Sequence, residues 1–305
     1  SPICLKIENK DSKIDVLPDV TRPRPGHADL AGIIKYGQKD VRNILERASA
    51  RETAARVAAG ALAKILLARF DIKVLGYVKG IGGINSKKIA KTPNEILINR
   101  NKSKVYCLDK LAEAKMIEKI KKAKKEGDSL GGTIEIVAFG VPPGLGNHTQ
   151  WELRLDGILA GALMSIQGIK AVEIGLGFGF SRKFGSQVHD EIFYCEDKGA
   201  FSRTTNNAGG IEGGMTNGEV VIARAVMKPI PTLMKPLRSV DIITKKPESA
   251  STERSDVCAV PAVSVVGEAV VAFEIARCFM EKFGGDSINE VTRNYEGYLK
   301  QICAI

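Results

Sequence analysis

The chain has 305 residues, 44% of them hydrophobic, which is enough for one large domain or two ordinary ones with a sizeable core. Its net charge of +10 favours an anionic partner. Only 6% of the residues are aromatic, and no Arg-rich aromatic stripe indicates base stacking, so we do not expect a nucleic-acid-binding protein. No apolar run of about 18 residues is present, so we expect no membrane span.

The six cysteines are far apart in the sequence and include no CxxC pair. This spacing argues against a zinc ribbon or a disulfide framework and suits the reducing cytoplasm. The three histidines are equally scattered, so we expect no metal site.

The first residues, SPICLKIENKD, lack the basic start and apolar stretch of a signal peptide. Within them Ile3, Leu5 and Ile7 fall on alternate positions. Alternation of this kind predicts a β-strand whose apolar side chains share one face.

Residues 49–70 give the strongest helix signal. Ser49 and Glu52 have the spacing of a capping box, so Ser49 is the predicted N-cap. An apolar stripe follows on one face, and its members are Val57, Ala58, Ala61, Leu62 and Ile65. The many alanines predict that the backbone of a neighbouring element approaches closely.

Further along the chain, 133–140 alternates like a strand, with Ile134 and Ile136 on the opposite face to Glu135 and Val137. A second strand, broken by glycines, is predicted at 171–180. Helices are predicted at 110–125, where the lysines form a solvated face, at 153–166 and at 265–285. Strands and helices mix without a strict βαβ rhythm, which favours one layered α+β domain.

Two segments near the start combine rigidity with positive charge. In RPRPGHAD, residues 22–29, two prolines and a glycine fix a turn that would hold His27 in one orientation for proton exchange. A surface turn with a solvated histidine is the alternative. In ERAS, 46–49, a helix start flanked by Arg47 and Arg51 suits an anion, although a simple helix cap fits equally well.

Three later segments could also line a ligand site. Five glycines within 204–218 would let main chain approach a ligand closely, or would simply form a mobile loop. KPIPT, 228–232, is a rigid extended piece that suits a pocket wall. ERSDVCAVPA, 253–262, sets Asp256 near Arg254, which would keep the carboxylate ionised. An ordinary surface ion pair is the alternative there.

Taken together, these segments resemble the chorismate synthase family from the first residue to the last. The motifs that carry the resemblance are, in chain order, RPGHAD, RASARETAARVAAGA, PPGLG, ALMSIQGIKAVEIG, NNAGGIEGGMTNG, MKPIPT and RSDVCAVPA. The resemblance implies a layered β-α-α-β sandwich with mixed or antiparallel sheets and long packed helices, assembled as a homotetramer. It implies conversion of 5-enolpyruvylshikimate 3-phosphate to chorismate by 1,4-anti elimination of phosphate, with reduced FMN required although there is no net redox change.

Carried over by position, the resemblance implies that His27 supplies a proton to reduced flavin and that Asp256 relays a proton from the N5 side of the flavin. Arg24 and Arg51 fall where the family holds the phosphate or carboxylates of the substrate. The flavin contacts that it implies are Arg47, Ala48, Ser49, Gln167, Gly168, Gly213, Lys228, Pro229, Ile230, Pro231, Thr232 and Arg254.

The sequence also departs from the family pattern. The family usually begins with a segment that holds a GESHG-type motif and, later, an RRPG-type stretch, and neither occurs in these 305 residues. We therefore expect residues 1–305 to form a single chorismate synthase domain that lacks this segment and is poorly active by itself. At 43–49 the chain has NILERAS, where some relatives have a glycine-rich GGGRSS.

Two other functions remain open at this stage. A flavoprotein reductase would use the same pocket for NAD(P)H, although no separate reductase domain is visible in the sequence. A non-enzymatic protein that binds anions or nucleic acid would depend on the +10 charge alone.

Overall fold

The computed structural model describes residues 2–10, 16–89, 91–196 and 200–304. Its centre is a five-stranded antiparallel sheet in the order β2-β1-β3-β9-β4. These strands are β1 (Lys73–Ile81), β2 (Ile84–Asn85), β3 (Gly132–Phe139), β4 (Ile169–Ile174) and β9 (Val221–Met227). Three two-stranded hairpins complete the described β-structure, namely β5 (Ile192–Cys195) with β6 (Ala200–Arg203), β7 (Ile211–Glu212) with β8 (Met215–Thr216), and β10 (Arg238–Val240) with β11 (Pro247–Ser249).

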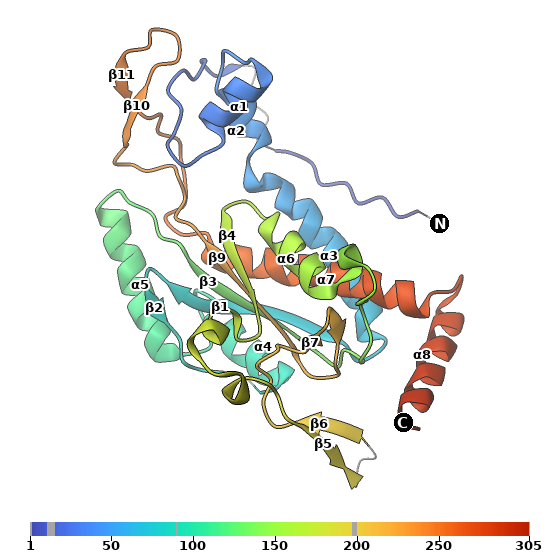
Figure 1. Ribbon diagram of the computed structural model, residues 1–305. Coiled ribbons are helices and arrows are strands. Elements are labelled where there is room, and N and C mark those ends of the chain that lie inside the picture. The colour runs from blue at the N-terminus through green and yellow to red at the C-terminus, as the bar shows by residue number, and fades with distance from the viewer. Residues whose placement is uncertain (1, 11–15, 90, 197–199, 305) are drawn as a thin grey trace.

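Helix α7 (Val260–Phe283) forms the core of the molecule on one face of this sheet (Figure 1). It packs on β1 and β3, with α6 (Leu155–Met164) beside it over β4. Helix α3 (Thr53–Ala68) runs along α7, and α8 (Ile288–Ile302) follows it in sequence. Because α7 is covered by the sheet, by α3 and by α6, most of its residues are buried, which explains why its sequence is apolar nearly all round.

The opposite face of the sheet carries a second, smaller apolar cluster. Tyr77 and Val137 pack there with Ile96 of α4 (Pro93–Lys102), and α5 (Lys110–Lys125) lies near β2. Ile134 and Ile136 belong to the cluster under α7 instead. The predicted assignment of β3 side chains to two faces is therefore confirmed, as is the solvated lysine face of α5.

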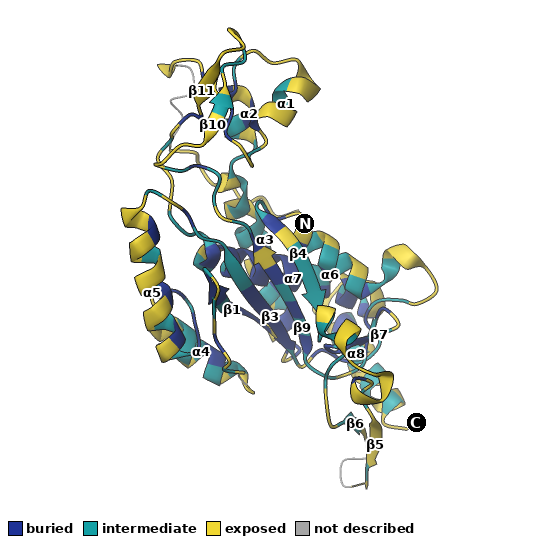
Figure 2. Cartoon of the chain, turned by 60° about the vertical axis from the view of Figure 1, so that its left-hand side comes forward, coloured by how far each residue is buried: buried dark blue, intermediate teal, exposed yellow. Residues whose placement is uncertain are grey.

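A small lobe stands above this body and is mostly exposed (Figures 1 and 2). It combines α1 (Asp29–Tyr36) and α2 (Arg42–Arg47) with the β10–β11 hairpin from much later in the chain. Side-chain bonds join the two parts, such as Thr21 Oγ1 to Asp241 Oδ2 (2.5 Å) and Ser251 Oγ to the carbonyl of Arg22 (2.6 Å). The lobe is thus one unit made from two distant segments.

The strand predicted from Ile3, Leu5 and Ile7 is wrong. Residues 2–9 adopt no strand, and these three side chains are 72%, 48% and 57% exposed. Alternation alone does not make a strand, because an extended segment also needs a partner strand for its backbone hydrogen bonds. No described residue supplies that partner.

The helix predicted at 49–70 is present but differs at its start and in its buried face. Ser49 accepts a bond from the backbone of Arg51 and caps a short 3₁₀ turn, η2 (Ala50–Glu52), before α3 begins. Leu62 and Ile65 of the predicted apolar stripe are exposed, whereas Gly60 and Leu67 are buried. Alanine-rich helices leave the choice of buried face ambiguous, since so many positions on them are small.

Two other predicted elements have different ends in the structure. The strand predicted at 171–180 ends at Ile174, where glycines start a turn, and the last predicted helix begins at Val260 because Pro261 fits its first turn. The sequence analysis missed α4, α8, β1 and β9 altogether. For α8 a signal existed, since Ser287 and Glu290 form a capping box.

The close backbone approach predicted from the alanines is confirmed at Gly60 of α3. A Cβ at this position would lie 2.6 Å from both the Cα and the carbonyl oxygen of Ala269 in α7. Gly60→Ala should therefore lower the free energy of unfolding by about 2 kcal/mol, the usual cost of overpacking, as measured by denaturant unfolding. The matched control is Gly161→Ala in α6, where no atom lies within 4 Å, and helix propensity should raise stability slightly. Equal stability of the two variants would contradict this packing.

Candidate active site

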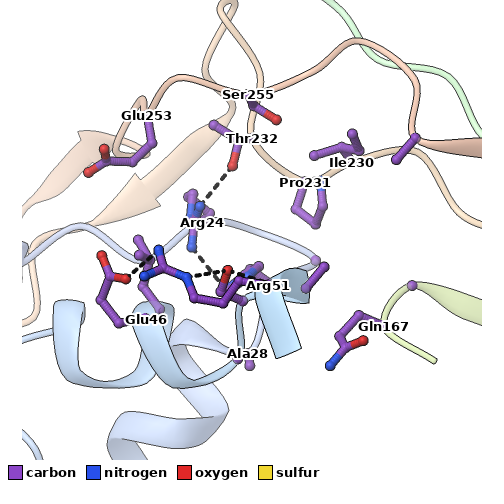
Figure 3. Close-up of a pocket in the computed structure, with 18 of the residues that line it drawn as sticks. Arg24, Ala28, Glu46, Arg51, Gln167, Ile230, Pro231, Thr232, Glu253 and Ser255 are labelled. Carbon is purple, nitrogen blue, oxygen red and sulfur yellow. Dashed lines mark hydrogen bonds and ion pairs between the residues drawn. The ribbon is translucent and has the colours of Figure 1, made fainter. Parts of the chain in front are cut away.

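A pocket of about 1190 Å³ lies between the small lobe and the body (Figure 3). Five stretches of chain form most of its wall: 24–28 before α1, 42–51 through α2 and η2, 167–168 after α6, 227–232 at the end of β9 and beyond, and 253–259 before α7. Asn9 and Leu17 also line it. The α1–α2 part of the lobe and the body therefore take part, whereas no residue of the β10–β11 hairpin lines the pocket. Such a position between two packed units is common for a small-molecule site.

The structure brings fifteen of the sixteen site residues expected from the sequence into this pocket. They are Arg24, His27, Arg47, Ala48, Ser49, Arg51, Gln167, Gly168, Lys228, Pro229, Ile230, Pro231, Thr232, Arg254 and Asp256. Four of the five segments singled out in the sequence meet here, although more than 200 residues separate the first from the last. Their proximity is a structural fact, and their individual roles remain predictions.

Gly213 is the exception. It lies in the β7–β8 turn, at the end of the sheet away from α1 and α2, and does not line the pocket (Figure 1). Its φ of +59° suits a tight turn that other residues rarely adopt. Asp190 accepts bonds from the backbone of Asn207 and Ala208, so this part of the glycine-rich segment is held in place, and its expected contact with a ligand stays a prediction.

On the lobe side of the pocket, the side chains of Arg24 and His27 both contact the carboxylate of Asp29. Arg24 donates from Nε to Asp29 Oδ2 (2.8 Å), and its backbone N–H donates to the same oxygen (2.9 Å). The Nδ1 atom of His27 lies 2.5 Å from Asp29 Oδ1. Arg24 also donates to Thr232 Oγ1 (2.7 Å), which ties the turn to the opposite wall (Figure 3).

Asp29 is completely buried as the first residue of α1, yet it is ionised. Burial by itself raises the pKa of a carboxyl group, but the hydrogen bonds from His27 and Arg24 outweigh it and hold the pKa of Asp29 well below its usual range. A buried carboxylate with two partners fixes their positions, because separating it from either would leave a buried charge unpaired. The sequence analysis gave Asp29 no role, although an aspartate two residues after His27 is close enough in sequence to contact the histidine ring.

Positive charge exceeds negative charge in the pocket wall. Six cationic side chains line it, namely Arg24, Arg42, Arg47, Arg51, Lys228 and Arg254, against three carboxylates, Glu46, Glu253 and Asp256. Arg51 forms an ion pair with Glu46 (2.7 Å), and its Nε donates to Ser49 Oγ (3.2 Å). This excess of cations suits a ligand with several negative charges.

Gln167 carries an unsatisfied polar atom at the pocket wall. Its Nε2 donates to Glu52 Oε1 (2.6 Å), whereas its Oε1 is buried and has no hydrogen-bond partner in the described structure. Buried acceptors of this kind are uncommon because each lost bond costs about 1–3 kcal/mol. A ligand with an N–H or O–H group would satisfy this atom.

Asp256 and Arg254 both lie exposed at the pocket, in the segment that leads into α7. The structure shows no ion pair between these two described residues, so the expected Arg254–Asp256 pairing is not formed. The sequence analysis also missed Arg42 and Glu253, which form a 3.8 Å ion pair at the pocket wall.

No cluster of three or more His, Cys, Asp or Glu side chains in the described part of the chain could hold a metal ion. None of the described helices combines the length and the apolar character needed to cross a bilayer.

The pocket and its cations define a site for a small polyanion within an α+β fold, and comparison with known proteins gives the family. The family described as "Chorismate synthase" matches residues 1–280. Two curated relatives with the same name come from Pelobacter propionicus (55% identical, covering 99% of this chain and 81% of the relative) and Desulforudis audaxviator (56% identical, 100% and 81%). A solved structure titled "Crystal Structure of Chorismate Synthase" has 44% identity and a TM-score of 0.79, over 91% of this chain and 77% of that one.

This chain belongs to the chorismate synthase family. The resemblance inferred from the sequence motifs is confirmed, as are the α+β fold class and the predicted lyase function under that family name.

The Asp29 cluster predicts a pH dependence of stability. Because folding lowers the pKa of Asp29 below the 3.8 typical of an unfolded chain, its stabilising effect is complete above about pH 5 and is lost as the pH falls. Asp29→Asn should lower the free energy of unfolding by about 3 kcal/mol at neutral pH, and the gap from the unmodified protein should narrow below about pH 4. Denaturant unfolding across this range measures it.

The matched control is Asp286→Asn at an exposed site, where little change is expected at any of these pH values. A stability gap for Asp29→Asn that stays constant from neutral pH to about pH 3 would show that the Asp29 charge does not carry the effect.

Proposed function

We propose that this protein converts 5-enolpyruvylshikimate 3-phosphate to chorismate by 1,4-anti elimination of phosphate, with reduced FMN as cofactor. The observation that carries the proposal is the convergence of His27, Asp256 and six cations on one pocket. The substrate bears a phosphate and two carboxylates, so a wall rich in arginine matches its charge. The family membership supports the same conclusion.

The residues present fit FMN. The unpaired Oε1 of Gln167 offers an acceptor to an N–H of a flavin ring, and Arg47 with Lys228 offers charge to its phosphate or anionic ring. The 228–232 segment forms a wall with two prolines, which stiffen it. When bound, reduced FMN would supply a transient electron donation that weakens the C–O bond of the substrate and is reversed after hydrogen loss.

The protein's own contribution is binding, orientation and proton movement. Arg24 and Arg51 would hold the anionic groups of the substrate, and the cations would stabilise the departing phosphate more strongly as charge develops on it. His27 would donate a proton from Nε2, the ring nitrogen that Asp29 does not engage. Asp256 would take up the proton that the substrate loses.

The protein is also proposed to act as a homotetramer in the cytoplasm. Exposed apolar side chains support the assembly, and the β5–β6 hairpin alone presents Ile192, Phe193, Tyr194 and Phe201 on its surface. All six cysteines are unpaired, which suits a reducing compartment.

Two alternatives make different predictions. A flavin reductase that uses the same pocket would oxidise NADPH without added reductant, and a simple anion binder would take up flavin without regard to the substrate. Binding of reduced FMN that strengthens when 5-enolpyruvylshikimate 3-phosphate is present would support the lyase against both.

His27→Ala in the full-length protein should slow turnover by about 10²-fold or more, the usual contribution of a general acid or base. Anaerobic chorismate formation, followed spectroscopically, measures it. His189→Ala is the matched control because His189 is exposed and lies outside the pocket. If the His27 variant keeps the unmodified rate, His27 takes no part in the chemistry.

Asp256→Asn should slow chorismate formation while FMN affinity stays nearly unchanged, because the amide keeps the size of the side chain but cannot accept a proton. Flavin titration and single-turnover kinetics separate the two effects. A loss of FMN binding equal to the loss of rate would make Asp256 a binding residue and remove it from the proton path.

A further inference from the structure

The ring of His27 has one nitrogen engaged and one available. Nδ1 lies 2.5 Å from Asp29 Oδ1, and the side chain of His27 is 19% exposed while that of Asp29 is fully buried. No hydrogen bond from Nε2 to another described residue is present, and His27 lines the pocket. The two nitrogens are therefore in different surroundings.

The chemistry of the neighbours decides which nitrogen carries the hydrogen. Ionised Asp29 only accepts, and the Arg24 guanidinium only donates. Arg24 NH2 lies 3.0 Å from His27 Nδ1 and 3.1 Å from Asp29 Oδ1, so it can donate to the carboxylate instead. The arrangement that satisfies every group has both Nδ1–H and Arg24 donating to Asp29.

The backbone of the segment holds this arrangement in place. The N–H of His27 donates to the carbonyl of Arg24 (3.2 Å), and Gly26 closes the turn with a φ of +79°. Asp29 begins α1 and accepts from the backbone N–H of Arg24 (2.9 Å). The side chains of Asp29, Arg24 and His27 therefore all extend from one rigid turn, which holds them in fixed positions relative to one another.

We propose that Asp29 is a positioning residue for His27: it fixes the tautomer with hydrogen on Nδ1 and presents Nε2 to the pocket as the atom that exchanges protons. The statement that Nε2 exchanges protons rests on the proposed function, whereas the statement that Asp29 fixes the tautomer does not. Asp29 is fully buried and does not line the pocket, so it acts through the imidazole. The same division of labour applies to the aspartate of a Ser-His-Asp triad, which orients its histidine without itself changing protonation state.

The charges around the ring make Asp29 necessary for this role. Arg24 lies on the same turn, and Lys228 reaches over from the segment after β9 to bond the carbonyl of Gly26. Across the pocket stand Arg47, Arg51 and Arg254, with Glu46, Glu253 and Asp256 as the carboxylates. Among these carboxylates, Asp29 is the one hydrogen-bonded to the ring of His27.

The first test uses the unmodified protein and needs neither flavin nor substrate. The chain has three histidines, and His148 and His189 are exposed, so nitrogen-15 NMR of the labelled protein gives three ring systems that single substitutions can assign. At a pH where the ring of His27 is neutral, we expect hydrogen on Nδ1 and an unprotonated Nε2. Hydrogen on Nε2 would overturn the proposal.

The second test is Asp29→Asn. An asparagine can donate to Nδ1 and so favour the opposite tautomer, and we expect the Nε2–H form of His27 to increase and kcat to fall by about 10-fold or more, with a smaller change in KM. Glu46→Gln is the matched control, because it removes a carboxylate of the same pocket that makes no contact with His27, and the tautomer should not change. An unchanged tautomer in Asp29→Asn would overturn the proposal.

These readouts separate the inference from the proposed function. If the tautomers behave as expected but His27→Ala leaves turnover intact, Asp29 orients His27 as stated and the proposed proton role of His27 fails. If His27→Ala abolishes turnover but the unmodified ring carries its hydrogen on Nε2, the proposed function stands and the positioning role of Asp29 fails.

Discussion

The ionised carboxylate of Asp29, buried without solvent contact, is the interaction on which the pocket depends. An unpaired charge in that position would cost several kcal/mol, so the fold must deliver hydrogen-bond partners to it. Arg24 and His27 are those partners, and both also line the pocket. The requirement to satisfy one buried charge therefore places the guanidinium and the imidazole that the proposed chemistry uses.

The same cluster connects parts of the chain that are distant in sequence. Arg24 bonds Thr232, and Lys228 bonds the carbonyl of Gly26, so the turn before α1 is fastened to the segment after β9. Ser239 Oγ adds a bond to the carbonyl of Pro23 (2.5 Å). Because the bonds of Arg24 and Lys228 cross between the lobe and the body, the width of the pocket depends on them, and the two proline-containing segments keep its walls stiff.

The sequence predicted which segments meet at the pocket better than it predicted the individual helices and strands. Residues such as His27 and Arg51 sit in motifs whose order is specific to the family, so their convergence could be expected without knowing the packing. The buried face of α3 could not, because alanine fits either a core or a surface, and only the contact of Gly60 with Ala269 resolves it. The strand expected at Ile3 to Ile7 failed because alternation does not reveal whether a partner strand exists.

Long-range pairing also explains the missed residues. Glu253 looks like an ordinary surface charge in the sequence, and only the fold sets it against Arg42. Gly213 is the one expected site residue that does not line this pocket, because it lies in the β7–β8 turn, and its expected flavin contact stays a prediction. Motif order predicts which segments matter, but hydrogen bonds formed across the fold determine what each side chain does.

A crystal structure of the full-length protein with FMN and 5-enolpyruvylshikimate 3-phosphate tests the central claim most directly. The account predicts that the flavin ring contacts Gln167 and the 228–232 wall, with Nε2 of His27 facing the ligands and the phosphate of the substrate among the arginines. Flavin and substrate bound outside this pocket, or His27 turned so that Nε2 faces Asp29, would contradict it.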